Sequence, residues 1–430
     1  MIRVLMLGWE FPPLFSGGLG IATFGIVKAL SPKTRIRLII PTAAALTKLN
    51  HVNITGFNHI TAEELNFERL QFQFSSLPVE TNQLPIRISP YHDVNAEIVR
   101  TEWNDFQWLQ TKKKVEIIHR LFVGTEVYGA NIMHKVQLFT QLCEEIGSRN
   151  NFDIIHAHDW ITFPAGVKIK AKTGKPLILH VHSLETDRAG VDVRNEIYAL
   201  EKTAMEEADR IIVVSHYTKD QVVEHYQIDP ARIVVVHNGI EPALTIRQRH
   251  RLNDKLVLFL GRLTHQKGPQ FLLETAEKVC RVFPRVKFVV AGTGDQFIPL
   301  LETSAYRKLG SKFIFTGFLT KAKVNEALSM ADVYFMPSVS EPFGLTALEA
   351  AQFGVPGVIS SQSGVAEVLR GSLQADFWDT DKFANYIYAL LRYKALAKEI
   401  AEKAKADLTQ LTWGHAAKKI LEIYSTLTEN

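Results

Sequence analysis

Short runs of apolar residues recur along the chain, and longer amphipathic stretches separate them. The runs are continuous and do not alternate with polar residues, which is typical of strands buried on both faces of a parallel sheet. In the first half the expected strands are 3–7, 37–40, 154–156, 177–182, 210–214 and 233–236. In the second half they are 256–260, 286–290, 312–315, 333–336 and 355–359. This pattern predicts an α/β protein with buried parallel strands.

Helical periodicity fills the intervals between these strands, as at 270–282 and 321–330. Alternating strands and helices predict a doubly wound architecture. The strands fall into two sets with a polar stretch, 241–253, between them, so we expect two Rossmann-like domains, residues 1–245 and 254–411. The tail from 382 to 430 has a helical pattern. Residues 50–130 fit this scheme least, and we expect an insertion there with some antiparallel strand.

The composition is that of an ordinary globular protein. The chain has 430 residues, of which 46% are hydrophobic and 22% charged, which excludes a disordered, collagenous or coiled-coil chain. A net charge of +4 does not demand a nucleic acid partner. Cys143 and Cys280 are too few for a disulfide framework or a cysteine-based zinc site, which favours a reduced, cytoplasmic protein. The N-terminus does not have the pattern of a signal peptide, and Gly, Pro and Ser interrupt the longest uncharged runs, 11–27 and 350–366.

Two glycine-rich segments follow expected strands. Gly17, Gly18 and Gly20 lie between the first strand and a helix expected near residue 21. Glycines there allow close backbone approach and positive φ, and the helix N-terminus behind them offers N–H groups to an anion. Gly292 and Gly294 follow the strand at 286–290. Each segment indicates either a ligand-binding loop or a tight turn alone.

A basic loop follows the strand at 256–260. Arg262 and Lys267 stand five residues apart between Gly261 and Gly268. At the carboxyl end of a parallel strand, such a pair can bind a diphosphate, with Arg as a fork and Lys as a point charge. The alternative is a solvated charged loop.

Two acidic residues flank the start of a helix after the strand at 333–336. Glu341 precedes the helix and Glu349 lies within it, eight residues on. Carboxylates suit sugar and ribose hydroxyls because their oxygens accept hydrogen bonds. The amides of Gly344, Leu345 and Thr346 at the helix start suit phosphate.

Histidine pairs close two strands of the first half, in the segments 156–160 and 180–183. Imidazoles two residues apart on a strand share a face, so a metal site is one interpretation. Polar residues that close strands at a cleft are the other, and we favour it. Asp379 and Asp381 imitate a metal-binding triplet, but helix capping explains them better.

Taken together, the chain resembles retaining glycosyltransferases of the two-domain GT-B fold, families 4 and 5, which include the glycogen and starch synthases. The resemblance covers nearly the whole chain except residues 50–130. The residues that carry it are Glu341 through Glu349 with Ala350, Gly354 and Pro356, the 261–268 loop, the segment 156–160, and Asn238-Gly239-Ile240. Glycogen synthases carry a lysine where this chain has Phe15.

The resemblance implies a role for each matching residue. Arg262 and Lys267 would neutralise the donor diphosphate, and Glu341 would hold hydroxyls of the transferred sugar. Other positions then follow from the family: Gly17, Gly18, Gly292, Gly294, Gly344, Leu345 and Thr346 near the donor, Glu349 at the ribose, His182 by the reacting sugar, and Asp159 on the acceptor side. The family's last helix crosses back to the first domain, which here would be about residues 412–430.

The implied activity is transfer of a hexose, such as glucose, from a nucleotide sugar such as ADP- or UDP-glucose to a glycan or other hydroxyl acceptor, with retention. We expect neither a cofactor nor a metal ion, because two cations and helix N-termini can stabilise the departing diphosphate. The alternatives are a sugar-nucleotide epimerase of similar fold and a non-catalytic module that binds sugar nucleotides. A membrane-surface acceptor would need a basic patch, and the run Lys112–Lys114 is the one candidate, which a solvated helix face explains better.

Overall fold

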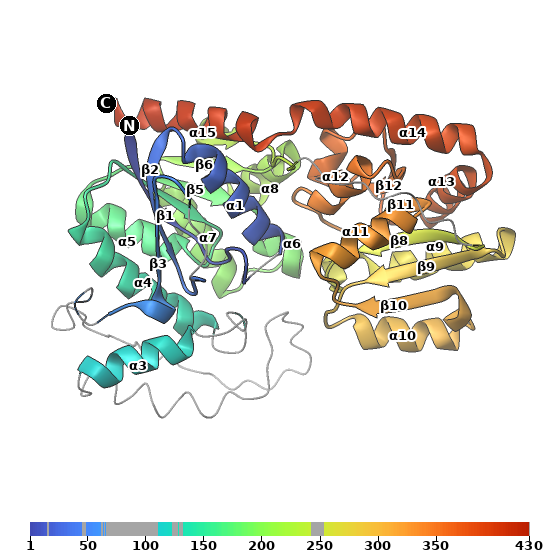
Figure 1. The fold of residues 1–430 in the computed structure, drawn as a ribbon, viewed down its shortest axis with the longest axis horizontal. Helices are drawn as coiled ribbons and strands as arrows, with labels where there is room; N and C mark the ends of the chain where they lie inside the picture. The colour runs from blue at the N-terminus through green and yellow to red at the C-terminus, as the bar shows by residue number, and fades with distance from the viewer. Residues whose placement is uncertain are drawn as a thin grey trace.

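The structure is a computed structural model, and it describes residues 1–14, 17–44, 49–61, 63, 65, 111–122, 128, 132–241 and 253–429. Two parallel sheets lie side by side in it, and helices cover both faces of each (Figure 1). The prediction of an α/β chain with two Rossmann-like domains is confirmed.

The first sheet has the strand order β3-β2-β1-β4-β5-β6-β7 over the described residues, and every pairing in it is parallel. Its strands are β1 (Ile2–Leu7), β2 (Thr34–Ile40), β3 (Val52–Gly56), β4 (Ile154–His158), β5 (Leu177–Val181), β6 (Arg210–Val213) and β7 (Ile233–Val235). The accompanying helices are α1 (Gly18–Leu30), α3 (Thr111–Leu121), α4 (Ile132–Arg149), α5 (Phe163–Thr173), α6 (Glu185–Ala189), α7 (Glu196–Glu207) and α8 (His216–Tyr226).

The second sheet has the order β10-β9-β8-β11-β12-β13 and is also parallel. Its strands are β8 (Lys255–Leu260), β9 (Val286–Ala291), β10 (Phe313–Gly317), β11 (Val333–Met336), β12 (Gly357–Ser360) and β13 (Leu373–Ala375). The helices are α9 (Pro269–Val282), α10 (Phe297–Tyr306), α11 (Lys321–Met330), α12 (Leu345–Gln352), α13 (Thr380–Arg392), α14 (Lys394–Asp407) and α15 (Trp413–Thr428). Single 3-10 turns include η4 (His265–Lys267) and η6 (Gly364–Glu367).

The strand order reverses once in each sheet, between β1 and β4 in the first and between β8 and β11 in the second. In open α/β sheets, ligands bind outside the carboxyl ends of the strands at such a switch point, because the connections leave in opposite directions and open a crevice. The glycine segment and Asp159 follow β1 and β4, while the basic loop and Glu341 follow β8 and β11. The topology therefore places the candidate motifs at the two switch points.

Three local details differ from the expectations or extend them. The described part of the 50–130 segment contributes β3, which pairs parallel with β2. Residues 66–110 lie outside the described residues, so the antiparallel strand expected in this segment stays a prediction. The strand β13 was not expected, because its three residues, Leu-Gln-Ala, do not form a continuous apolar run. The first glycine segment has no positive φ: Gly17 has φ −68°, and Gly18 and Gly20 already belong to the first turn of α1.

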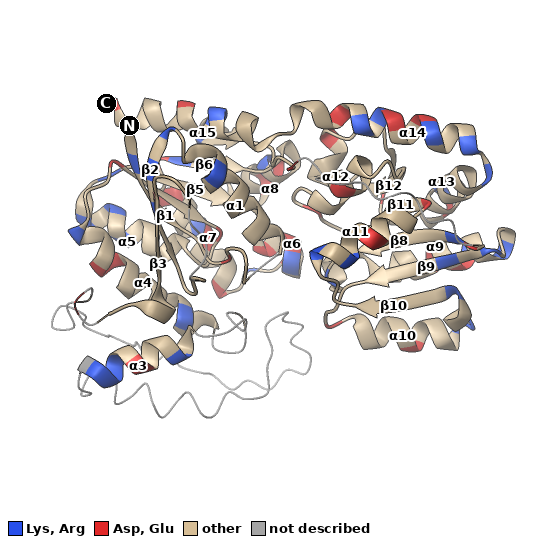
Figure 2. Ribbon diagram, in the orientation of Figure 1, with Lys and Arg blue, Asp and Glu red and all other residues tan. Residues whose placement is uncertain are grey.

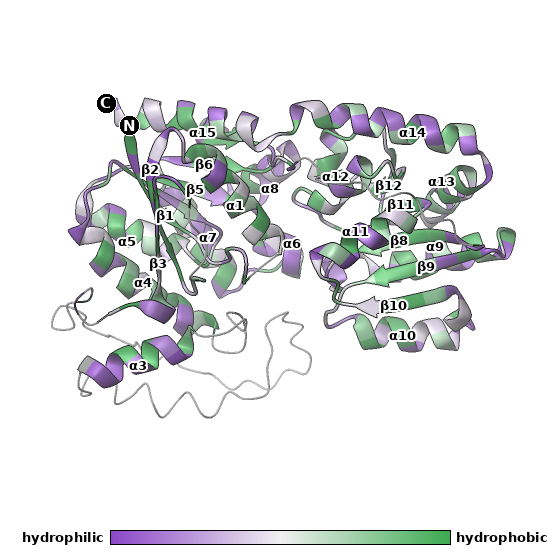
Figure 3. Ribbon diagram, viewed as in Figure 1, coloured by the Kyte–Doolittle hydropathy of each residue, from purple (hydrophilic) through white to green (hydrophobic). Residues whose placement is uncertain are grey.

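The central strands of both sheets are mostly apolar on both faces, which is why they read as continuous apolar runs (Figure 3). Charged residues of both signs are spread over the helices instead, with α14 an example (Figure 2). Cys143 is buried and Cys280 partly buried, and neither forms a disulfide. Among the described residues, no helix is both long and apolar enough to span a membrane.

The last helix returns from the second domain to the first. α14 lies on the second domain, and α15 continues from it and packs against α1 (Figure 1). Trp413 at the start of α15 is 5% exposed and belongs to the apolar cluster between α1 and the first sheet. Two glycines make room for it: a Cβ at Gly25 would lie 2.2 Å from the Trp413 ring, and one at Gly239 would lie 2.2 Å from its backbone nitrogen.

This packing gives a prediction. Gly25→Ala should lower the free energy of unfolding by about 1–3 kcal/mol, because the added methyl forces α15 away from α1. Urea unfolding measures the change. Gly414→Ala, one residue beyond Trp413, is the matched control: its Cβ would meet nothing closer than Thr412 at 3.7 Å, so it should be neutral or slightly stabilising. Equal effects of the two variants would contradict the packing.

Candidate active site

The basic loop after β8 and the acidic loop after β11 lie against each other. Nζ of Lys267 is 2.5 Å from Oε2 of Glu341, and the two side chains are 22% and 10% exposed. Oγ of Ser338 donates to the same carboxylate oxygen at 3.4 Å. Glu341 thus fixes the lysine rotamer within a largely enclosed pair. A cation that is held before the ligand arrives needs little reorganisation, which favours charge stabilisation.

Arg262 comes from the same loop but is exposed, and its charge reaches the first domain. Burial raises the pKa of the Glu10 carboxyl in the first domain, and the Tyr128 hydroxyl and the charge of Arg262 offset part of this effect.

Gly292 and Gly294 lie against the backbone of this basic loop, at φ +148° and +156°. A Cβ at Gly292 would lie 1.8 Å from the Gly261 oxygen, and one at Gly294 would lie 2.2 Å from the Leu263 oxygen. Their close approach is therefore to the chain's own backbone.

The helix α12 begins directly behind Glu341. Gly344, at φ +106°, is its N-cap, and a Cβ there would lie 2.9 Å from Val365. Oγ1 of Thr346 forms a hydrogen bond of 2.7 Å with the Tyr334 hydroxyl. Glu349 of α12 is 14% exposed and forms an ion pair with Lys321 of α11. Lys321 thus supplies the partner that a largely buried carboxylate requires.

The glycine segment of the first domain surrounds a buried carboxylate, Glu10, which the sequence analysis did not select. Its Oε2 accepts the backbone N–H of Gly20 at 3.2 Å, and its Oε1 accepts the Tyr128 hydroxyl at 2.5 Å. A Cβ on Gly17 would lie 2.8 Å from the same Oε2, whereas Gly18 faces open space. Glu10 therefore occupies part of the α1 N-terminus. The available signal was an acidic residue directly after a buried strand at a switch point.

Asp159 and His182 meet at the carboxyl ends of β4 and β5. Oδ1 of Asp159 accepts the backbone N–H groups of His182 at 2.7 Å and Ser183 at 3.1 Å. Asp159 itself has φ +61°, which a short acidic residue tolerates. Burial raises its pKa to about 6, against the lowering effect of Arg188 and the two N–H groups. The Asp159 carboxylate therefore fixes the backbone at His182 and Ser183.

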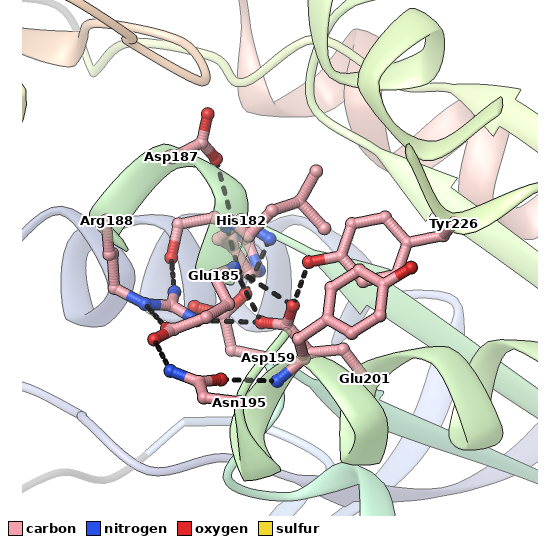
Figure 4. A network of polar contacts seen from close by, with 11 residues as sticks. Asp159, His182, Glu185, Asp187, Arg188, Asn195, Glu201 and Tyr226 are labelled. Atoms are coloured by element: carbon pink, nitrogen blue, oxygen red, sulfur yellow. Dashed lines mark hydrogen bonds and ion pairs between the residues drawn. The ribbon is translucent and has the colours of Figure 1, made fainter. Parts of the chain in front are cut away.

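A network of ion pairs holds the segment that follows His182 (Figure 4). Arg188 of α6 donates to Glu185 at 2.9 Å, to Glu201 of α7 at 2.7 Å and to the Ser183 hydroxyl at 2.7 Å. Tyr226 donates to the other oxygen of Glu201. All these groups are largely buried, so the connection between β5 and α6 is rigidly attached to α7.

The two domains touch at this segment. α6 lies against η4, the turn that carries Lys267. The Ser340 hydroxyl, next to Glu341, donates to Asp187 of α6 and forms a second hydrogen bond of 3.0 Å with the Tyr217 hydroxyl of α8. Ser215 donates to the Pro342 oxygen at 2.7 Å. The loop of Glu341 is therefore enclosed by first-domain residues that follow His182.

Two groups of possible metal ligands occur among the described residues, His156, His158 and His180, and His216, His237 and Glu367. In the first, the rings of His156 and His158 face each other at 4.4 Å and 22°, so their in-plane lone pairs run side by side and do not meet at one ion. In the second, the Glu367 carboxylate already accepts the N–H groups of His216 and Tyr217 and bonds to the His237 ring. Neither group fits a bound ion as arranged.

Asp379 caps α13 by accepting the Lys382 N–H at 3.0 Å, which confirms the capping interpretation.

The structure thus brings Lys267 and Glu341 of the second domain into contact, and Arg262 of the same basic loop acts on Glu10 beside the Gly17 segment. The segment that follows His182 packs against the loop of Glu341. Gly292 and Gly294 lie behind the basic loop, and Glu349 lies one turn into α12. The catalytic and binding roles of these residues stay predictions.

Comparison with known proteins gives a consistent family. Residues 241–407 match the family model of glycosyl transferases group 1, and residues 111–244 match that of glycosyltransferase family 4. An alpha-maltose-1-phosphate synthase of Mycolicibacterium smegmatis is 30% identical over 325 residues, which cover 66% of this chain and 82% of that protein. A glycogen synthase of Mycobacterium tuberculosis is 28% identical and covers 98% of this chain and 94% of its own.

A solved structure has the same architecture. Anabaena HepE in complex with UDP and glucose superposes with a TM-score of 0.66 at 16% identity, over 99% of this chain and all of that one. With matched family models on both halves and two switch points that face each other, this chain belongs to the group 1 glycosyltransferases of the GT-B fold and is an enzyme of the transferase class.

Proposed function

We propose that this enzyme transfers a hexosyl group, glucose in the first instance, from a nucleotide diphosphate sugar to a hydroxyl of a glycan, with retention at the anomeric carbon. The observation that carries the proposal is the Lys267–Glu341 ion pair at the second switch point, with Arg262 in the same basic loop as Lys267. The two cations there can neutralise a diphosphate, and the carboxylate can accept hydrogen bonds from the hydroxyls of the attached sugar. The names of the glycogen and maltose-1-phosphate synthases, and the UDP and glucose bound to HepE, support the choice of substrate class.

The bond between the anomeric carbon and the diphosphate oxygen breaks in this reaction, and a bond from that carbon to the acceptor oxygen forms. The departing diphosphate gains negative charge, which Arg262 and Lys267 stabilise, while Glu341 accepts hydrogen bonds from sugar hydroxyls. The acceptor proton passes to the departing diphosphate on the same face of the sugar. We propose front-face attack, by analogy with the retaining families that the chain resembles.

The first domain excludes water. Contacts from Asp187 and Tyr217 to Ser340 close the gap next to Glu341. Water exclusion strengthens every charge interaction in the site and suppresses hydrolysis of the donor. We further propose that a divalent ion is not required, because two side-chain cations do the work of charge neutralisation.

The experiment combines binding and product analysis. Purified protein is first screened with UDP-, ADP- and GDP-glucose by thermal unfolding, where a donor at 100 times its dissociation constant should stabilise by about 2.7 kcal/mol. The stabilising donor is then incubated with maltooligosaccharides, with and without EDTA, and the anomer of the product is read by NMR. A lengthened α-linked product that forms equally in EDTA supports the proposal. Release of free nucleotide and an epimerised sugar without acceptor would identify an epimerase instead.

A further inference from the structure

The N-terminus of helix α8 in the first domain is completed by a residue of the second domain. The first N–H groups of a helix have no partner within it. Ser215, the N-cap of α8, accepts the N–H of Thr218 at 2.9 Å. The N–H groups of His216 and Tyr217 donate instead to the two oxygens of the Glu367 carboxylate, at 3.0 and 2.6 Å. A helix of one domain therefore depends on an acid of the other for its cap.

Glu367 is held there as a carboxylate. Its side chain is 23% exposed, and its Oε2 also bonds to Nε2 of His237 at 3.0 Å. Burial acts to raise the pKa of Glu367, but the bonds to His237, Tyr217 and His216 outweigh burial, so the pKa lies below its usual value. The dipole of α8 favours a negative charge at this end. Charge-assisted hydrogen bonds thus attach η6, which ends at Glu367, to the first domain.

The segment that contains η6 also holds the backbone of Glu341. The N–H of Glu341 donates to the Gln362 oxygen at 3.0 Å, and the Glu341 oxygen accepts the N–H of Gly364 at 2.9 Å. Glu341 and Ser363 form a parallel bridge, and Ser363 is buried. The backbone of Glu341 is therefore fixed by a segment that Glu367 attaches to α8.

The start of α8 contacts the loop of Glu341 directly as well. The hydroxyls of Ser215 and Thr218 donate to the Pro342 oxygen at 2.7 and 3.3 Å, and both residues are fully buried. A Cβ on Gly364 would lie 2.2 Å from the same Pro342 oxygen and 2.4 Å from the Cβ of Ser215. No side chain fits between the three segments, so a movement of η6 relative to α8 displaces the loop of Glu341 too.

We propose that Glu367 is a positioning residue for glycosyl transfer: by anchoring η6 to α8, it keeps the backbone of Glu341 in place. The Glu341 carboxylate in turn bonds to Lys267, so a shift of this backbone also moves the ion pair at the second switch point. Displacement by about 1 Å is enough to cost a large part of a catalysed rate. The action of Glu341 on the sugar rests on the proposed function, but the anchor itself does not.

Hydrogen exchange tests the anchor without any substrate. In Glu367→Ala, the amides at the start of α8 and those of residues 341–365 should both exchange faster than in the wild type, by about tenfold or more, because charge-assisted bonds are lost. Asp379→Ala is the matched control, since it also removes a carboxylate that caps a helix, but α13 and Asp379 lie in one domain. It should leave both regions unchanged. Faster exchange that is confined to α8 would show that Glu367 is a helix cap only, and would overturn the proposal.

Turnover tests the position of Glu341. The donor is the one of UDP-, ADP- and GDP-glucose that stabilises the wild type. With it, kcat of Glu367→Ala should fall on the order of tenfold to a hundredfold. The dissociation constant of the matching free nucleoside diphosphate should not change, because that ligand has no sugar hydroxyls for Glu341. Glu367→Gln keeps one acceptor oxygen and should lose less of the rate, and Asp379→Ala should keep the wild-type kcat.

A folded Glu367→Ala protein with the wild-type kcat would overturn the positioning role, and so would an equal loss of turnover and nucleotide binding. If Glu367→Ala does not fold, Glu367→Gln decides, and a full kcat in that variant counts against the proposal. If the wild type transfers no sugar from any of the three donors, while faster exchange in Glu367→Ala spreads from α8 to residue 341, the anchor is supported and it is the proposed function that fails.

Discussion

Replacing Lys267 by Ala should lower kcat by about 10²–10³-fold, the loss typical when one fixed group that stabilises transition-state charge is removed. The reason is the geometry at the second switch point, where Nζ of Lys267 is held 2.5 Å from Glu341 before any substrate binds. Lys267→Arg keeps the charge but changes its shape, so it should recover only part of the rate.

The control for this substitution is Lys323→Ala. Lys323 also forms an ion pair with a glutamate in the second domain, but it is 65% exposed, so its removal should change neither kcat nor the urea midpoint. Lys267→Ala leaves Glu341 without its cation, and its folding must therefore be measured beside its turnover. An unchanged kcat in a folded Lys267→Ala protein would remove Lys267 from the site.

Mild acid should destabilise the protein through the histidine array, the four stacked rings of His156, His158, His180 and His182 at the ends of β4 and β5. The four imidazoles are neutral in the folded chain, with the pKa of His156 and His182 lowered to about 3, but they titrate near pH 6.5 when unfolded. Between these values the unfolded chain binds more protons, so this stability is complete above about pH 6.5 and is lost as the pH falls. The Tyr424 hydroxyl and Asp159 are the other titratable groups at the array, and burial keeps the Tyr424 pKa well above its usual value.

Some buried acids act in the opposite direction. Burial raises the pKa of Glu201 to about 7 and that of Asp159 to about 6, and it also raises those of Glu10 and Asp187. These carboxyls bind protons in the folded chain that the unfolded chain lacks, so they offset part of the histidine effect. The net loss should be about 1–3 kcal/mol of unfolding free energy per pH unit between about pH 6 and 5.

Urea unfolding at pH 5, 6 and 7.5 measures this loss, and His180→Leu isolates one imidazole. Its slope of unfolding free energy against pH should be smaller than that of the wild type by about 1.4 kcal/mol per pH unit, the value for one proton. His51→Asn, at an exposed position with φ +62°, should leave the slope unchanged. Parallel slopes for His180→Leu and the wild type would contradict a neutral buried array.

The sequence contains more signal for the second-domain half of the candidate site than for the first-domain half. Arg262, Lys267 and Glu341 lie in the loops that follow β8 and β11, and their residue types already indicate the proposed chemistry. Glu10 was missed because a single acidic residue after a strand has no pattern of its own, and its partners, Gly20 and Tyr128, lie 10 and 118 residues away. The histidine pairs were recognised and interpreted as polar residues that close strands at a cleft, but their stacking on one another could not be predicted, because it depends on the register between two strands.

By itself the sequence determined the two-sheet α/β fold, since continuous apolar runs that alternate with amphipathic helices are typical of parallel sheets covered by helices on both faces. It also determined which loops carry cations, acids and glycines. The tertiary structure alone decided which of these groups meet: that Lys267 contacts Glu341 across 74 residues, that Ser340 reaches Asp187 in the other domain, and that His158 holds His182. The physical reason is that such contacts depend on strand order, register and side-chain burial, and none of these is a local property of the chain.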